Sequence, residues 1–294
     1  MDTIWLNLMG TTLKHHYIDV NGLRVRCLEA GDGPPLLMLH GGGGHLEAYA
    51  RNIGALASHF HIYAVDLIGH GYTGRPPIER YSFMTIVKFI GDLQQALGLE
   101  RVNIAGLSIS AMSAAVYAGL NPDRVSQLIL NTGVPLLADE EGRTRWRTSI
   151  EQRQKVTAHG SWTLEAVRAR LGRVFHDGEA GVPDELVAVR HRIYNQPGFT
   201  AYNNQLVEDL LREIIEENEF TMEIGPQSLR KIECPTTLLW TTVNPGQGIG
   251  VAKEALSKLR NGKLVVFDRS GHWPQWEQAE DYNALVLKTM AGEA

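Results

Sequence analysis

The sequence predicts an α/β protein in which alternating strands and helices build one mostly parallel sheet of eight strands flanked by helices. Short apolar runs typical of buried strands are separated by helical patterns, which is the rhythm of a parallel sheet. A charged segment with helical periodicity and no strand pattern, from Ala138 to about Gly225, interrupts this rhythm. The alternation resumes at Cys234 and continues through the remaining strands.

Individual elements follow from local signals. Residues 16–22 and 23–29 have strand patterns, and Asn21-Gly22 is a strong signal for the tight turn of a hairpin. A helix at 83–97 has apolar residues at helical spacing and ends at Gly98, a favoured C-terminal residue. The further strands are expected at 35–40, 61–66, 102–105, 125–130, 234–240 and 263–268, and the further helices at 111–118, 251–259 and 279–290.

We divide the chain into a core of residues 1–135, a helical lid of residues 136–228, and a second part of the core at 229–294. An insertion between two sheet strands is expected to lie over their carboxyl ends, where ligands bind in open α/β sheets.

Composition excludes several classes of function. The 294 residues are 44% hydrophobic and 21% charged, which is ordinary for a globular protein. The net charge of −5 gives no basic footprint for nucleic acid. No apolar run is long enough to span a membrane, and the first ten residues lack the features of a signal peptide. We therefore predict a cytoplasmic protein with no nucleic-acid or membrane partner, and the sequence leaves open whether it forms a homo-oligomer.

Neither the cysteines nor other potential ligands indicate a metal or redox centre. Cys27 and Cys234 are the two cysteines, each in or beside a predicted core strand, so we expect buried, reduced thiols. No cluster of His, Cys and Asp has metal-ligand spacing. We expect no metal and no organic cofactor.

A serine lies at the centre of the predicted chemistry. Gly106-Leu-Ser-Ile-Ser110 follows an apolar strand and precedes a helix of small residues. This context is typical of the G-x-S-x-G elbow, which exposes a nucleophilic serine above a sheet. Ser110 takes the place of the usual second glycine. The pentapeptide alone is equally compatible with an ordinary turn, so the hypothesis depends on the rest of the chain.

Two further segments support Ser108 as the nucleophile. Four glycines, 41–44, directly follow the strand at 35–40, where the lack of side chains lets backbone N–H groups face a cavity. We expect the backbone amides of Gly42 and Ile109 to form an oxyanion hole. We expect Gly41 and Gly43, on either side of Gly42, to line the substrate site. His272 follows the last strand, and we expect it to take the serine proton.

Together these motifs resemble the α/β-hydrolase superfamily over the whole chain. Within it the sequence is most similar to the meta-cleavage-product hydrolases, which hydrolyse C–C bonds in 2-hydroxy-6-oxo-dienoates from aromatic-ring degradation. The similarity is carried by Gly271-His-Trp-Pro-Gln-Trp-Glu277 and by two segments of the insertion, 175–178 and 183–190. It implies that Arg190 binds the substrate carboxylate and that Phe175 and Trp273 wall the pocket. Without the resemblance, an arginine on such a helix is more often a solvated residue than a ligand.

The position of the triad acid departs from this family. The superfamily usually carries an acid after the strand at 234–240, and this chain has Asn244 there. Asn131 fills the other position where some relatives have an acid, and Asp139 and Asp268 are weak substitutes. A neutral amide can orient the imidazole but supplies no charge for its cation. Asp66, which also follows a strand, is interpreted together with His70 as structural.

The resemblance implies the following reaction. Arg190 orients an anionic dienoate, the enol becomes a ketone, and Ser108 with His272 attacks the distal carbonyl or activates a water that does. Leu107 and Ile109-Ser-Ala111 differ from the Asn and Met-Gly-Gly usual in these hydrolases. A carboxylic ester or lactone hydrolase is therefore the first alternative, and a ligand-binding relative without the triad acid is the second.

Overall fold

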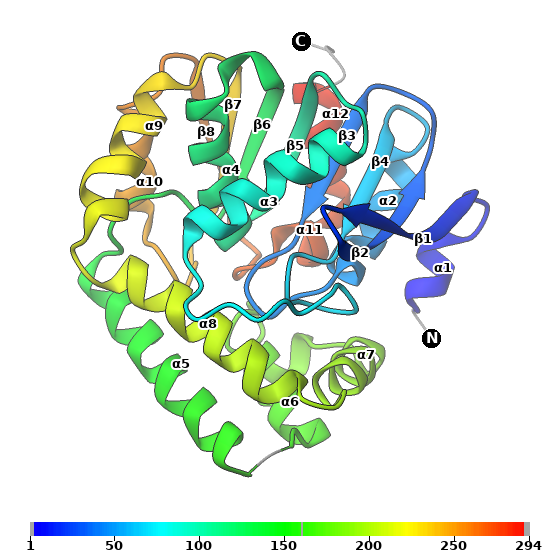
Figure 1. Cartoon of the computed structure of the whole chain (residues 1–294), viewed down its shortest axis with the longest axis vertical. Helices are drawn as coiled ribbons and strands as arrows, with labels where there is room; N and C mark the ends of the chain where they lie inside the picture. The colour runs from blue at the N-terminus through cyan, green and yellow to red at the C-terminus, as the bar shows by residue number, and fades with distance from the viewer. Residues whose placement is uncertain (1–2, 160, 291–294) are drawn as a thin grey trace.

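The computed structural model describes residues 3–159 and 161–290 and is built around one eight-stranded sheet. The strand order is β1-β2-β4-β3-β5-β6-β7-β8 (Figure 1). The hairpin of β1 (Leu13–Val20) and β2 (Leu23–Ala30) is antiparallel, and β2 also pairs antiparallel with β4 (His61–Val65). All other neighbours pair in parallel. The predicted eight-stranded, mostly parallel sheet is confirmed.

The inner strands are short and almost wholly buried, as their continuous apolar runs predict. The turn of the hairpin has positive φ at both Asn21 (54°) and Gly22 (83°), as a tight hairpin turn requires. The remaining strands are β3 (Pro35–Leu39), β5 (Val102–Leu107), β6 (Val125–Asn131), β7 (Thr236–Thr241) and β8 (Gly262–Phe267).

Helices cover both faces of this sheet (Figure 1). One apolar core is formed with α3 (Phe83–Ala96), α4 (Ile109–Leu120), α9 (Gly225–Lys231) and α10 (Ile249–Leu256). The other is formed with α1 (Ile4–Leu8), α2 (Ala50–Leu56) and α12 (Ala279–Met290). The short α11 (Pro274–Glu277) precedes α12.

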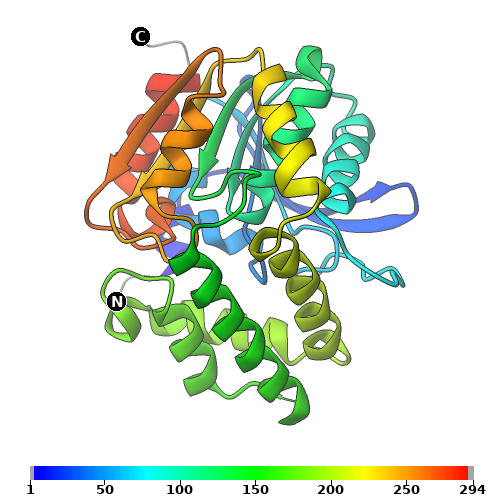
Figure 2. The same cartoon turned by 90° about the vertical axis from the view of Figure 1, so that its left-hand side faces the viewer.

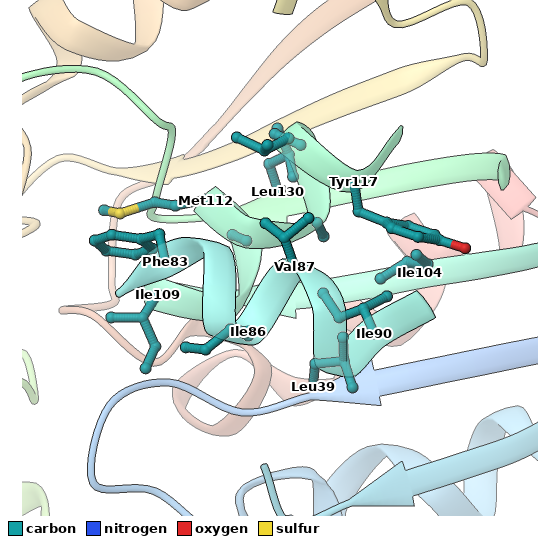
Figure 3. Close-up of a cluster of buried hydrophobic side chains, with 14 of the residues drawn as sticks. Leu39, Phe83, Ile86, Val87, Ile90, Ile104, Ile109, Met112, Tyr117 and Leu130 are labelled. Atoms are coloured by element: carbon teal, nitrogen blue, oxygen red, sulfur yellow. The ribbon is translucent and has the colours of Figure 1, made fainter. Parts of the chain in front are cut away.

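The packing of α3 on α4 fixes where α4 begins. Phe83, Ile86 and Val87 of α3 face Met112 and Ile109 of α4 in a buried cluster (Figure 3). The Ile109 side chain belongs to this cluster and also reaches the glycine loop, where a Cβ at Gly42 would lie 3.6 Å from it. Both cysteines are buried and free, as predicted. Within the described ranges, no helix combines the length and apolar character that a membrane span needs.

The segment between β6 and β7 is a helical insertion that lies at one end of the sheet (Figures 1 and 2). Its helices are α5 (Glu140–His159), α6 (Leu164–Gly172), α7 (Asp184–Tyr194) and α8 (Phe199–Ile215). The short η4 (Phe220–Ile224) and α9 return the chain to the sheet. Residues 225–228, placed in the predicted lid, belong to α9, where Ser228 packs closely against Gly119 of α4.

Candidate active site

Ser108 occupies the sharp turn between β5 and α4. The strand continues through Leu107, two residues beyond the predicted end, so the turn consists of Ser108 itself. Its φ of 56° and ψ of −117° are unfavourable for a residue with a side chain. The Ser108 N–H donates to the Asn131 carbonyl at 2.8 Å. A Cβ at Gly133 would lie 2.4 Å from the Ser108 carbonyl oxygen, so only glycine allows this approach.

Ser110 explains why the second glycine of the elbow is dispensable here. Its Oγ donates to the Leu39 carbonyl at 2.6 Å and accepts from the Leu107 N–H at 2.9 Å. One hydroxyl therefore ties the start of α4 to both β3 and β5. The sequence pattern gave no sign of this bridging role.

The glycine loop lies directly beside the serine. A Cβ at Gly41 would lie 3.1 Å from Ser108 Cβ, and one at Gly42 would lie 3.6 Å from the Ile109 side chain. In the described part of the chain, neither the Gly42 nor the Ile109 N–H donates to a protein acceptor. Two free amides next to a nucleophilic hydroxyl are the donors that a developing oxyanion requires.

His272 is oriented by an amide instead of a carboxylate. Its Nδ1 lies 2.6 Å from Asn244 Oδ1. The Asn244 Nδ2 donates to the Gln247 carbonyl at 2.7 Å, which identifies Oδ1 as the acceptor that faces the imidazole. The Nδ1 of His272 therefore carries the proton, and Nε2 is left free to accept one. This is the tautomer that a general base for a serine needs.

No carboxylate among the described residues takes the place of the triad acid. Burial alone lowers the pKa of His272 to about 4, without a contribution from a nearby charge. Asp139 accepts from the backbone N–H groups of Gly142 and Gly248, and Asp268 is exposed beside Arg269. Asn131, at the other potential acid position, donates to Gln275. Asp139 and Asp268, the weak substitutes named from the sequence, therefore make other contacts and do not bond His272.

The described residues contain no hydrogen bond between Ser108 and His272, although both line one cavity of about 530 Å³. Catalytic hydrogen bonds are often long without substrate and tighten when it binds. The His272 loop is held near the strand ends, because its carbonyl accepts from Thr132 Oγ1 at 3.2 Å and the Gly271 carbonyl from Thr241 Oγ1 at 2.7 Å.

The same cavity brings together most of the predicted site residues. Its lining includes Gly41, Gly42, Ser108, Ile109, Phe175, Arg190, His272 and Trp273. The rings of Phe175 and Trp273 are 5.7 Å apart. Asn244 lies behind His272, outside the lining. Gly43, expected at the substrate, is also outside it, because its carbonyl is turned to accept from the Tyr194 hydroxyl at 2.6 Å.

Arg190 projects from α7 into this cavity and is 3% exposed. Its Nε donates to His45 Nε2 at 3.5 Å, and its Nη2 is buried without a hydrogen-bond partner. The guanidinium lies 5.0 Å from the Trp273 ring centroid. Burial lowers the pKa of Arg190 to about 10, which leaves it cationic at neutral pH. It is a buried cation available to an anionic ligand.

Several residues at the cavity were missed by the sequence analysis. Further arginines from the insertion line it, namely Arg145, Arg153, Arg170 and Arg173, and no acidic side chain is part of the lining. The Trp146 ring meets His272 edge-on at 6.1 Å. The sequence showed only a charged, helical segment here. Which of its charges face inward depends on how the helices pack.

Asp66 and His70 are structural, as interpreted from the sequence. Asp66 accepts from the N–H groups of Leu46 and Tyr72 and from Arg26. His70 Nδ1 bonds the Ile68 carbonyl at 2.9 Å. Neither is part of the cavity lining.

Comparison with known proteins agrees with this architecture. A family model described as "alpha/beta hydrolase fold" matches residues 34–159. A 2-hydroxy-6-oxo-6-phenylhexa-2,4-dienoate hydrolase from Burkholderia cepacia is 26% identical and covers 96% of this chain and 97% of its own length. A 2-hydroxy-6-oxononadienedioate/2-hydroxy-6-oxononatrienedioate hydrolase from Paraburkholderia xenovorans strain LB400 is also 26% identical, over 90% of this chain and 89% of its own.

A solved structure gives the same picture of the fold. A 2-hydroxy-6-oxo-6-phenylhexa-2,4-dienoate hydrolase from Rhodococcus sp. strain RHA1 superposes with a TM-score of 0.80 at 22% identity. The match covers 97% of this chain and all of the Rhodococcus chain. The two chains therefore share one fold.

Proposed function

We propose that this chain, which has the α/β-hydrolase fold, is a serine-dependent hydrolase that cleaves a C–C bond in an anionic 2-hydroxy-6-oxo-dienoate from aromatic-ring fission. The observation that carries the proposal is the convergence of Ser108, His272 and Arg190 on one cavity. Relatives that match at least 90% of the chain are named for hydrolysing such dienoates. The cytoplasmic location stays a prediction from the sequence.

The geometry supports the following sequence of steps. Arg190 pairs with the dienoate carboxylate, for which a guanidinium offers parallel charge-assisted bonds. The enol is converted to its keto form. Ser108 gives its proton to His272 Nε2 and attacks the distal carbonyl, or activates a water that does. The Gly42 and Ile109 amides stabilise the oxyanion, and the C–C bond breaks as the short enol acid leaves with the proton from His272. After serine attack, a water then hydrolyses the acyl-serine to release the acid; after water attack, the acid forms directly.

The neutral Asn244 suits this reaction better than ester hydrolysis. It holds the productive tautomer of His272 but offers no charge to the imidazolium that forms as the serine attacks. Where ketonisation of the substrate limits the rate, the missing charge has a smaller effect. The insertion serves as the lid, because α5, α6 and α7 contribute Trp146, Arg170 and Arg190 to the lining of the cavity that also contains Ser108.

A substrate screen with matched variants tests the proposal. Loss of the coloured 2-hydroxy-6-oxo-6-phenylhexa-2,4-dienoate is followed beside hydrolysis of 4-nitrophenyl acetate. We expect the wild type to turn over the dienoate and Ser108→Ala to abolish this turnover. Ser113→Ala is the control: Ser113 lies on the same helix and its hydroxyl bonds only the Ile109 carbonyl within that helix, so turnover should stay near wild type. Turnover of the ester alone would establish the first alternative. Binding of the dienoate without turnover of either compound would establish the second.

Arg190→Gln separates the two hydrolase activities. Removing one partner of a buried charged pair costs about 2–5 kcal/mol, so kcat/KM for the dienoate should fall about 30-fold or more. The neutral ester has no carboxylate to lose, and its hydrolysis should change less than threefold. Equal losses on both substrates would reject carboxylate recognition by Arg190.

A further inference from the structure

The cavity has a second concentration of positive charge beyond Arg190. Arg153 of α5 and Arg170 of α6 line the same cavity, and neither belongs to the reaction described above. Arg153 is 4% exposed, and Arg170 is partly buried. Two cations from different helices of the insertion thus converge on one space.

Arg170 is held by aromatic rings and not by an anion. Its guanidinium lies 5.5 Å from the Trp162 ring centroid and 5.4 Å from that of Tyr194. Among the described residues it makes neither an ion pair nor a hydrogen bond. A Cβ at Gly43 would lie 2.5 Å from Arg170 Nη2, so the absence of a side chain at Gly43 makes room for this group.

Arg153 adds a second charge beside it. It donates to Asn204 Oδ1 at 3.3 Å. Glu208, whose charge also acts on Arg153, accepts from Arg212 at 2.7 Å and from Gln154 at 2.9 Å. Burial and neighbouring arginines lower the pKa of Arg153, and burial lowers that of Arg170, which a bound anion would relieve.

A smaller pocket extends the cavity between α5 and α6. It has a volume of about 250 Å³ and shares Arg153, Arg170 and Arg173 with the main cavity. Its own lining adds Lys155 and contains neither an acidic side chain nor Ser108, His272 or Arg190. The two spaces therefore meet at arginines, and one of these, Arg170, lies against Gly43 of the glycine loop.

We propose that Arg170 and Arg153 form a second anion subsite, distinct from Arg190, which binds a carboxylate at the distal end of a dicarboxylate substrate. The guanidinium carbons of Arg170 and Arg190 are at most 11.1 Å apart, since they lie 5.4 and 5.7 Å from the same Tyr194 ring centroid. One small dicarboxylate can bridge that separation. The proposal rests on the proposed function and narrows its substrate class to dienoates with two carboxylates.

The test compares two dienoates that differ only at the distal end. 2-Hydroxy-6-oxonona-2,4-dienedioate has a distal carboxylate, and 2-hydroxy-6-oxohepta-2,4-dienoate ends in a methyl group. We expect wild type to prefer the dioate at least tenfold in kcat/KM. Arg170→Gln should lower kcat/KM for the dioate by about 30-fold and that for the methyl ketone by less than threefold. Arg190→Gln should lower both, because both carry the carboxylate that Arg190 binds.

Two further variants test whether the effect of Arg170→Gln comes from the lost charge. Arg168 lies on the same helix as Arg170, but its side chain pairs with Asp184 outside both pockets. The variant Arg168→Gln should therefore have the substrate preference of the wild type. Arg170→Lys keeps the charge and should restore part of the preference for the dioate. Equal losses on the two dienoates in Arg170→Gln, or no preference in wild type, would overturn the subsite.

Failure of the proposed function has a different signature. If wild type turns over neither dienoate, C–C hydrolysis is rejected, and the subsite is decided by binding instead. The absorbance change of each dienoate on binding to Ser108→Ala gives both dissociation constants. A dioate that binds at least tenfold more tightly, with the preference lost in Ser108→Ala/Arg170→Gln, supports the subsite. Equal dissociation constants reject it.

Discussion

At the scale of single residues, the site depends on Ser108 and His272 acting as a unit held by backbone contacts. Ser108 keeps an unfavourable positive φ because the Asn131 carbonyl and Gly133 fix its peptide groups. His272 is fixed through its own N–H, which donates to the Val174 carbonyl at 2.6 Å. Neither side chain is needed for these backbone contacts, so each can be removed with little change in the loop.

Ser108→Ala and His272→Ala should therefore each remove most of the turnover, and the double variant should be scarcely worse. Members of such a unit are strongly non-additive, since loss of either group stops the proton transfer. The measurement is kcat on the dienoate for the single and double variants. Ser113→Ala is the matched control. Multiplicative losses in the double variant, or Ser108→Ala within threefold of wild type, would contradict the assignment.

A second prediction for single residues concerns Asn244 and the pH dependence of ester hydrolysis. With the pKa of His272 lowered to about 4, kcat/KM for an aryl ester should be flat above about pH 5 and fall near pH 4. Asn244→Asp places a negative charge at Nδ1, which raises the pKa of His272 and moves this limb to higher pH. Ester turnover at pH 7 should rise by tenfold or more, because the imidazolium gains a counter-charge.

The same substitution should weaken the fold. The Gln247 carbonyl, now 2.7 Å from an N–H donor, would face a carboxylate oxygen, and its remaining donor is Trp240 Nε1 at 2.8 Å. We expect the free energy of unfolding to fall by about 1–3 kcal/mol. Asn244→Ala removes the acceptor without adding charge and should lower turnover. An acid limb that stays near pH 4 in Asn244→Asp, with no gain in turnover, would show that this position is not the vacant acid site.

Part of the site is predictable from the sequence, because part of it is local. Ser108 is marked by its elbow, and His272 by its place after the last strand. Arg170 is not marked, since a charged helical pattern does not say which arginine faces a cavity. The Gln247 carbonyl that orients Asn244 also depends on loop geometry that no local pattern encodes.

At the scale of elements, the start of α5 controls the loop that carries Asn244. A Cβ at Gly142 would lie 1.8 Å from the Gly246 carbonyl oxygen, and the Trp146 ring packs where a Cβ at Gly246 would project. Asp139 adds hydrogen bonds to both segments, through the N–H groups of Gly142 and Gly248. The insertion is thus coupled to the loop that carries Asn244 through this contact, and through Asn244 to His272.

Gly142→Ala should lower dienoate turnover by at least tenfold, because α5 and the 242–248 loop must separate and the Asn244–His272 hydrogen bond lengthens. Gly250→Ala is the control on α10, where an added Cβ meets nothing within 4 Å. That control should keep its activity and gain about 0.4–1 kcal/mol of stability from the lower entropy of its unfolded chain. The two variants are compared by kcat and by urea unfolding. Unchanged kcat in Gly142→Ala would show that the loop is positioned independently of α5.

Long elements are well predicted and short ones are not. The helix at 279–290 and the hairpin have patterns that span several turns or alternations, and both are confirmed. The helices α1, α9 and α11 have four to seven residues, too few for a period to be recognised, and were missed. The predicted limits of strands differ by up to three residues, as at β1, which begins at Leu13 and not at His16, and at β5, where the strand continues to the serine.

At the scale of the whole molecule, the charge around the cavity is opposite in sign to the net charge of the chain. The chain carries a net charge of −5, yet arginines line the cavity and acidic side chains are absent from its lining. Of these arginines, Arg145 pairs with Glu141, whereas Glu47, whose charge acts on Arg190, is engaged by Arg26 and His45. Such a local field concentrates anions at the site in spite of the overall negative charge.

Buried neutral histidines should make the fold sensitive to acid. Burial lowers the pKa of His40, His45, His70 and His272, the last two to about 4. Between about pH 6.5 and pH 4 these histidines bind protons in the unfolded chain but stay neutral in the folded protein. The free energy of unfolding therefore decreases as pH falls through this window. Burial raises the pKa of Asp66 to about 6 and also raises those of Asp209, Glu213 and Glu277, which acts in the opposite direction. These three are less buried than the four histidines, so we expect the histidines to dominate.

Each histidine contributes up to about 1.4 kcal/mol per pH unit to this slope. Urea unfolding at pH 7.5 and pH 5.0 should therefore differ by several kcal/mol, with the lower stability at pH 5.0. His70→Gln should reduce the slope by about one proton, because the His70 imidazole is fully buried, with its Nε2 lacking a hydrogen-bond partner in the described structure. A free energy of unfolding that stays constant from pH 7.5 to pH 5.0 would mean that these histidines become protonated within the fold, and the cavity would then have to admit water to them.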